Sequence, residues 1–359
     1  MINKLLGIEH PIVGFSPSEQ VAAAVSRAGG LGVLGCVRFN DPDDLEAALC
    51  YMDDNTDGKP YGVDIVMPAS VPIEENLEAR IPLSHKEFVE NTLLKLGVPP
   101  LPEGEQAGVG VLGWLHSVAR SHVEVALKHR PRLIANALGP PPPDVVDRAH
   151  EHGMLVAALA GKADHARHHV ELGVDVIVAQ GYEAGGHTGE IASMVLVPEV
   201  VDAVGERVPV LAAGGIGSGR QIAAALALGA VGAWLGSAWM VSTEYQMSTD
   251  AARKALLKAT SSDTVRSRVY TGKPARLLKN RWTQAWNDPD APAPLPMPLQ
   301  NLLVAEAHQR LMRANDPEVV PIPVGQIVGR MNEVRPVAAI VADLVEQLRA
   351  TLARLSSID

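Results

Sequence analysis

The chain has 359 residues, of which 47% are hydrophobic and only 4% aromatic, and its formal net charge is −10. Most single domains are shorter than this, but one α/β barrel with added segments reaches this length. The hydrophobic content excludes a disordered chain. The acidic balance opposes non-specific binding to nucleic acid or to an anionic membrane, because both require concentrated Lys and Arg. A small-molecule ligand is therefore favoured.

The N-terminal segment bears on the cellular compartment of the protein, and the cysteines bear on disulfide and metal binding. Glu9 interrupts the N-terminal segment before a signal-peptide core develops, and no uninterrupted apolar run reaches ~18 residues. A cytoplasmic protein is expected. Cys36 and Cys50 lack the spacing of a zinc site, so we expect neither a structural disulfide nor a bound metal.

A repeated pattern of short strand, turn and Ala-rich helix begins at the N-terminus. Residues 11–14 predict a strand, residues 17–28 predict a helix, and Gly29-Gly30 ends it. Seven further strands are predicted at 31–36, 61–66, 133–138, 155–160, 174–179, 208–213 and 232–236. Eight strands separated by helical segments favour a closed parallel (β/α)₈ barrel, the TIM-barrel fold, although an open doubly wound sheet also fits this periodicity.

Two long segments depart from the repeat. Residues 69–130 exceed a simple crossover and are expected to form an insertion in a barrel domain that spans residues 1–242. Residues 243–330 contain the proline-rich stretch 289–298 and predict a small lid or second lobe. Residues 331–359 then predict a C-terminal helix that returns to the barrel.

Glycine-rich turns follow the last two predicted strands. Gly214 and Gly215 follow one strand, and Gly236 and Ser237 lie where the next one ends. Glycines let the backbone approach a phosphate closely, and the helix that follows offers unpaired N–H groups. The glycines of either turn alone could serve only to form a tight turn, but two such turns side by side at one end of the barrel favour a phosphate site. No P-loop pattern is present.

The most specific motif follows the sixth predicted strand and reads Gln180-Gly181-Tyr182-Glu183-Ala184-Gly185-Gly186-His187-Thr188-Gly189. It resembles a motif of the nitronate monooxygenases, formerly 2-nitropropane dioxygenases, and of the related FMN-dependent enoyl-acyl-carrier-protein reductases. Segments 28–32, 61–64 and 212–230 are similar to the same family. The likeness covers most of residues 8–240.

The resemblance implies an FMN across the C-terminal mouth of the barrel, with its phosphate at the amides of Gly214, Gly215, Gly236 and Ser237. Trp234 and Leu235, which lead into the second turn, are included in that cofactor site. The ring would contact Gln180, Gly181, Gly185, Gly186 and Asp64. Many relatives carry Asn at the position of Asp64. The chain also reads Gly14-Phe15-Ser16-Pro17 where the family usually has a Pro-Met pair, so Phe15 is expected near the ring.

His187 is the leading catalytic candidate. An imidazole on a glycine-flanked loop can be placed against a substrate, and its ordinary pKa suits proton transfer near neutrality. The plainer alternative is a histidine that only holds its loop. The resemblance implies oxidation of alkyl nitronates by molecular oxygen to a carbonyl compound and nitrite, with His187 abstracting the α-proton of a neutral nitroalkane.

Other residues and functions remain open. His165, His168 and His169 predict the solvated face of a helix rather than a metal site, and Tyr270, Lys273 and Arg276 could reach over the site from the lid. The alternatives to a monooxygenase are an NAD(P)H-dependent enoyl-thioester reductase, a non-catalytic flavin-binding protein, and a flavin-free barrel isomerase or aldolase. The sequence allows a homodimer without indicating one.

Overall fold

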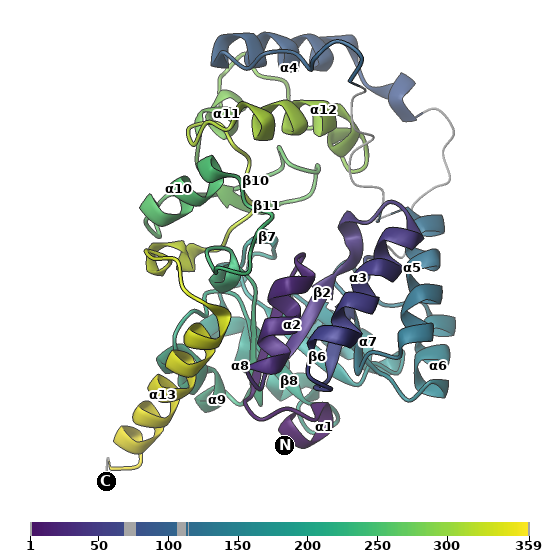
Figure 1. The fold of residues 1–359 in the computed structure, drawn as a ribbon, viewed down its shortest axis with the longest axis vertical. Helices are drawn as coiled ribbons and strands as arrows, with labels where there is room; N and C mark the ends of the chain where they lie inside the picture. The colour runs from purple at the N-terminus through teal and green to yellow at the C-terminus, as the bar shows by residue number, and fades with distance from the viewer. Residues whose placement is uncertain (1, 68–76, 106–112, 114, 358–359) are drawn as a thin grey trace.

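Eight parallel strands close into a barrel in the order β1-β2-β3-β4-β5-β6-β8-β9 (Figure 1). The computed structural model describes residues 2–67, 77–105, 113 and 115–357. The predicted (β/α)₈ barrel is confirmed, and the open sheet is wrong because β9 pairs with β1. The barrel strands are Ile12–Ser16 (β1), Leu31–Gly35 (β2), Tyr61–Asp64 (β3), Leu133–Asn136 (β4), Leu155–Ala160 (β5), Val176–Gln180 (β6), Val210–Ala213 (β8) and Gly232–Leu235 (β9).

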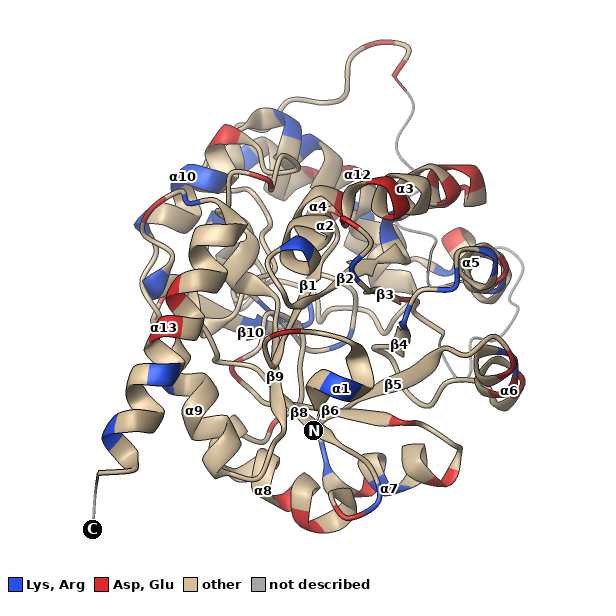
Figure 2. Cartoon of the chain, turned by 60° about the horizontal axis from the view of Figure 1, so that its bottom comes forward, with Lys and Arg blue, Asp and Glu red and all other residues tan. Residues whose placement is uncertain are grey.

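Aliphatic side chains fill the barrel interior, and a short helix covers one of its ends. Val13, Val33, Val178 and Leu211 belong to this inner cluster. The short helix α1 (Ile2–Leu6) adds its own apolar side chains to the cluster and covers the end where the strands begin (Figure 2). Functional residues in such barrels lie at the opposite end, where the strands finish.

A ring of helices covers the outer face of the barrel. The helices are Glu19–Arg27 (α2), Pro42–Asn55 (α3), His116–His129 (α5), Pro143–Glu151 (α6), Ala163–Glu171 (α7), Ser193–Val204 (α8), Gly219–Ala227 (α9) and Val337–Leu355 (α13). The last of these, α13, packs against both α9 and α2, so the C-terminal segment fills the gap in the ring after the final strand. Among the described residues, no helix is long and apolar enough to span a membrane.

A smaller layer lies above the barrel mouth (Figure 1). It contains α4 (Leu83–Leu96), α10 (Asp250–Lys258), α11 (Arg281–Ala285), α12 (Leu299–Ala314) and the antiparallel sheet β10-β11-β7, with β10 at Thr264–Ser267, β11 at Ala275–Leu278 and β7 at Gly186–His187. Short 3₁₀ turns lie at Cys36–Arg38 (η1), Leu77–Arg80 (η2), Ser237–Trp239 (η3) and Gln326–Arg330 (η4). Leu93, Trp282, Val304 and Leu311 form a separate apolar core for this layer.

The segment 69–130, expected to be an insertion, contains two unlike parts. Its helix α4 packs on α12 in the upper layer, whereas α5 packs on α3 in the barrel ring. Residues 69–76, 106–112 and 114 of this predicted segment lie outside the described residues.

Candidate active site

The predicted cofactor loops meet at one rim of the barrel. Gln180 ends β6, Gly214 follows β8, and Gly236 follows β9, and these three strands are neighbours in the order β6-β8-β9. Asp64 ends β3 at the same rim. Parallel strands finish at one edge, so residues far apart in sequence lie around a common mouth.

Both glycine turns present unused amides. Gly214 and Gly215 have φ values of 92° and 70°, in the left-handed region that favours glycine. Within the described part of the chain, the backbone N–H groups of Gly214, Gly215, Gly236 and Ser237 have no hydrogen-bond acceptor. Unpaired N–H groups clustered at a strand-to-helix junction suit an anion such as a phosphate.

The glycine-rich motif after β6 is tightly packed at its first part. A Cβ atom on Gly181 would lie 2.1 Å from Ser193 Oγ, so only glycine fits there. The Glu183 carboxylate accepts hydrogen bonds from Ser193 N at 3.0 Å and Ser193 Oγ at 2.9 Å, which fixes the start of α8. Gly185 lies against the backbone of Gly325. These residues hold the loop in shape.

The second part of the motif turns upward into the small sheet and carries His187. Gly186 has a φ of 71°, and His187 pairs with Ala275 of β11. The ring nitrogen Nε2 of His187 lies 2.7 Å from Thr271 Oγ1. Burial lowers the pKa of His187 to about 4, and the nearby Lys273 cation contributes in the same direction. The imidazole is therefore neutral at physiological pH and can accept a proton.

Arg276 joins the small sheet to the motif loop. Its buried guanidinium donates to the Tyr182 carbonyl oxygen from Nη2 at 2.9 Å and lies 4.3 Å from the centre of the Tyr182 ring. Of the other lid candidates, Lys273 is exposed and Tyr270 stacks on His308 at 4.9 Å. Sequence reasoning missed Thr271, the hydrogen-bond partner of His187, because a lone threonine in a turn carries no distinctive pattern.

The two predicted cofactor residues in β9, Trp234 and Leu235, point to opposite faces of the strand. Trp234 points into the barrel interior, where its ring stacks with Phe15 at 6.4 Å between ring centres. The Leu235 side chain packs on the opposite face, in the core beneath the helices. Successive side chains of a strand point to opposite faces of the sheet, so neighbouring residues must differ in this way. Leu235 can therefore offer only its backbone to a ligand at the mouth.

The histidines of α7 do not all lie on a solvated face. His165 and His168 are exposed, as expected, and His168 Nδ1 lies 3.9 Å from a Glu171 carboxylate oxygen. His169 is buried, and its Nε2 contacts the Leu159 carbonyl oxygen at 3.2 Å. The prediction is wrong for His169 because this position of the helix faces the barrel wall.

Asp64 is a buried carboxyl group without a full set of partners. Among the described residues, its Oδ1 atom has no hydrogen-bond partner. Burial raises the pKa of Asp64 to about 7. A ligand at the mouth that offers a polar edge to Asp64 would satisfy this atom, which fits the polar edge of a flavin ring.

Replacing Asp64 with Asn tests the buried carboxyl group directly. In the flavin-free protein the folded state holds a proton on Asp64 up to about pH 7, whereas the unfolded state loses it near ~3.9. The wild-type free energy of unfolding thus loses this contribution as pH rises from about 4 to 7. The free energy of unfolding should therefore rise for D64N relative to wild type by a few kcal/mol between about pH 4 and pH 7, as unfolding measured at several pH values would show. A difference that does not change with pH would contradict the assignment.

Comparison with known proteins decides the family. The family model described as nitronate monooxygenase matches residues 1–347. The chain belongs to the nitronate monooxygenase family. A "putative monooxygenase" of Mycobacterium tuberculosis is 49% identical, over 99% of this chain and 98% of that relative. A probable nitronate monooxygenase of Staphylococcus aureus is 28% identical, over 97% and 96% of the two chains.

Two solved structures of this fold are similar over nearly their full lengths. The nitroalkane oxidase of Streptomyces ansochromogenes matches with a TM-score of 0.82 and 28% identity, over 99% of both chains. FabK of Thermotoga maritima matches with a TM-score of 0.75 and 28% identity, over 100% of this chain and 98% of its own. The protein is thus an enzyme of the nitronate monooxygenase family on a TIM barrel.

Proposed function

We propose that this enzyme oxidises alkyl nitronates with molecular oxygen, using FMN, to give a carbonyl compound and nitrite. The observation that carries the proposal is the neutral His187 imidazole, which Thr271 holds in a sheet above the barrel rim. The rim carries backbone amides that have no acceptor among the described residues. The imidazole would serve as the base and the amides as the anion site, and the chemistry needs both. The relatives named for nitronates and nitroalkanes support the choice of substrate.

The chain's residues fit FMN at the mouth. The amides of Gly214, Gly215, Gly236 and Ser237, which have no acceptor among the described residues, suit its phosphate. We assign the contacts with the ring to Gln180, Gly181, Gly185, Gly186 and Asp64. Trp234 and Leu235 directly precede the second turn, and we include their backbone in the cofactor site. When bound, FMN supplies the electron transfer and the reaction with oxygen.

The protein's own part of the reaction is proton handling and orientation. His187 accepts the α-proton when the substrate is a neutral nitroalkane, and its contact with Thr271 fixes the direction of the ring. For a preformed nitronate, the same imidazole helps to hold the anion. Residues 243–330 act as the lid that shields this face from water.

The decisive experiment compares oxygen consumption with flavin reduction in the purified protein, which we expect to be yellow with bound FMN. We expect nitronates to drive oxygen consumption and nitrite formation without any nicotinamide. The second candidate is an NAD(P)H-dependent enoyl-thioester reductase, which the similarity to FabK favours. Anaerobic reduction of the flavin by NADH or NADPH, with no response to nitronates, would replace the proposal with that candidate. A flavin that responds to neither substrate class would indicate a non-catalytic binding protein.

A further inference from the structure

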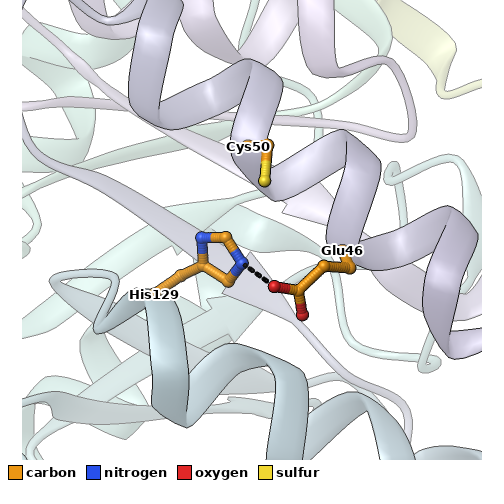
Figure 3. A group of neighbouring side chains, drawn as sticks. All are labelled: Glu46, Cys50 and His129. Atoms are coloured by element: carbon orange, nitrogen blue, oxygen red, sulfur yellow. Dashed lines mark ion pairs between the residues drawn. The ribbon is translucent and has the colours of Figure 1, made fainter.

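A group of metal-ligand side chains lies on the outer wall of the barrel, away from the mouth. Glu46 and Cys50 are one turn apart on α3, and His129 is the last residue of α5. One ligand atom of each lies within 4.8 Å of the others. Figure 3 shows the imidazole between the two helices, with the Glu46 carboxylate beside it and the Cys50 thiol above it.

The His129 ring is held as a ligand histidine would be. Its side chain is only 8% exposed, and Nδ1 lies 2.6 Å from Asp53 Oδ2. A carboxylate only accepts hydrogen bonds, so Nδ1 carries the proton. Asp53 is fixed in turn by the Tyr61 hydroxyl, which donates to Oδ1 at 2.7 Å. A carboxylate behind a histidine orients the ring and makes the other nitrogen more basic in many metal sites.

The other ring nitrogen points into the group. His129 Nε2 is buried, has no hydrogen-bond partner among the residues that the structure describes, and lies 3.2 Å from Glu46 Oε1. Because Nδ1 is engaged by Asp53, Nε2 is the ring nitrogen that can serve as a ligand atom. A cation held between Nε2 and the Glu46 carboxylate would contact both atoms.

We propose that Glu46, Cys50 and His129 bind one divalent cation of the zinc class, through oxygen, sulfur and nitrogen respectively, with Asp53 orienting the histidine. This mixed donor set suits zinc or cobalt rather than calcium or magnesium, which prefer oxygen alone. Three protein ligands leave one tetrahedral position for water. The group is within reach of solvent because Cys50 is exposed and the Glu46 side chain is 38% exposed.

The test is titration of the flavin-loaded protein with Zn²⁺ by calorimetry and with Co²⁺ by absorption beyond the flavin bands. We expect one tight site per chain, with the intense visible bands of tetrahedral Co²⁺. Cys50→Ser and His129→Ala should each remove that site while the flavin spectrum is unchanged. Since Cys50 is exposed, its replacement should not disturb folding. His168→Ala, at the exposed pair with Glu171, should leave binding unchanged.

Two further variants shift the affinity in opposite directions. Asp53→Asn would turn an amide N–H toward Nδ1 and move the ring proton to Nε2, so Zn²⁺ binding should weaken about 10- to 100-fold. Lys128→Met removes a cation whose Nζ lies 3.4 Å from Glu46 Oε2 and should strengthen binding.

Thiol labelling gives an independent readout. Zn²⁺ should slow alkylation of Cys50, whereas Cys36 is buried and serves as the unreactive internal reference. The proposal is overturned if wild type and C50S bind Zn²⁺ equally, or if neither binds. The latter result would mean that His129 only connects α5 to Asp53 and Glu46 of α3.

Discussion

Replacing His187 with Gln is expected to lower kcat/KM for a neutral nitroalkane by about 10²- to 10⁴-fold, the usual contribution of a positioned base. Glutamine can keep a hydrogen bond to Thr271 but cannot accept a substrate proton at neutral pH. The preformed nitronate has already lost that proton, so its turnover should fall much less. Oxygen consumption measured with both forms of one compound separates the two effects.

The pH profile of the same reaction provides a second check on His187. Because burial lowers the pKa of this imidazole to about 4, the base stays unprotonated down to that region. We expect kcat/KM for the nitroalkane to fall as pH drops through about 4, without an acid limb near 6.5. Equal losses for nitroalkane and nitronate in H187Q, at full flavin content, would show that His187 only supports the loop.

Replacing Gly214 with Ala is expected to weaken FMN binding by roughly tenfold or more. The residue has a φ of 92°, where a side chain costs about 1–2 kcal/mol, and ~1.4 kcal/mol corresponds to a factor of ten. A Cβ atom would also lie 2.9 Å from the Gly181 carbonyl oxygen, a backbone atom that cannot rotate away. Relief of this contact must move the turn whose amides suit the phosphate. Flavin fluorescence during titration of the flavin-free protein measures the change.

Gly153 provides the matched control for this substitution. Its φ is 72°, and nothing lies within 4 Å of an added Cβ atom. It precedes β5, at the barrel end opposite the mouth. Gly153→Ala should therefore carry similar backbone strain and lower stability while FMN affinity stays at the wild-type value. Equal loss of FMN in both variants would point to general destabilisation and remove the phosphate assignment from Gly214.

Local patterns were sufficient for the barrel but insufficient for the upper layer. The runs around Val33, Val178 and Leu211 are short, β-branched or aliphatic, and bounded by turn residues, so their strands could be predicted. The pairing of α4 with α12 could not, because it joins residues about 200 positions apart through a few apolar contacts with no periodic sign of the partner. The same holds for α13. Its amphipathic pattern predicts that one face is buried but does not indicate that α9 and α2 cover that face.

The candidate site divides in a similar way. The motif that contains His187 and the turns at Gly214 and Gly236 were visible because each follows a strand directly. For Arg276, the sequence indicated only a charged residue in the lid segment. Its burial against Tyr182 depends on the pairing of β7 with β11, a contact that forms across about 90 residues.

The amino-acid sequence by itself determined the strands, the turns after them and therefore the end of the barrel at which ligands can bind, since these depend on residues close together along the chain. Only the tertiary structure decided which side chains lose their water and which partners replace it. That is why the lowered pKa of His187, the orphan oxygen of Asp64 and the meeting of Cys50 with His129 appear only when distant segments pack together.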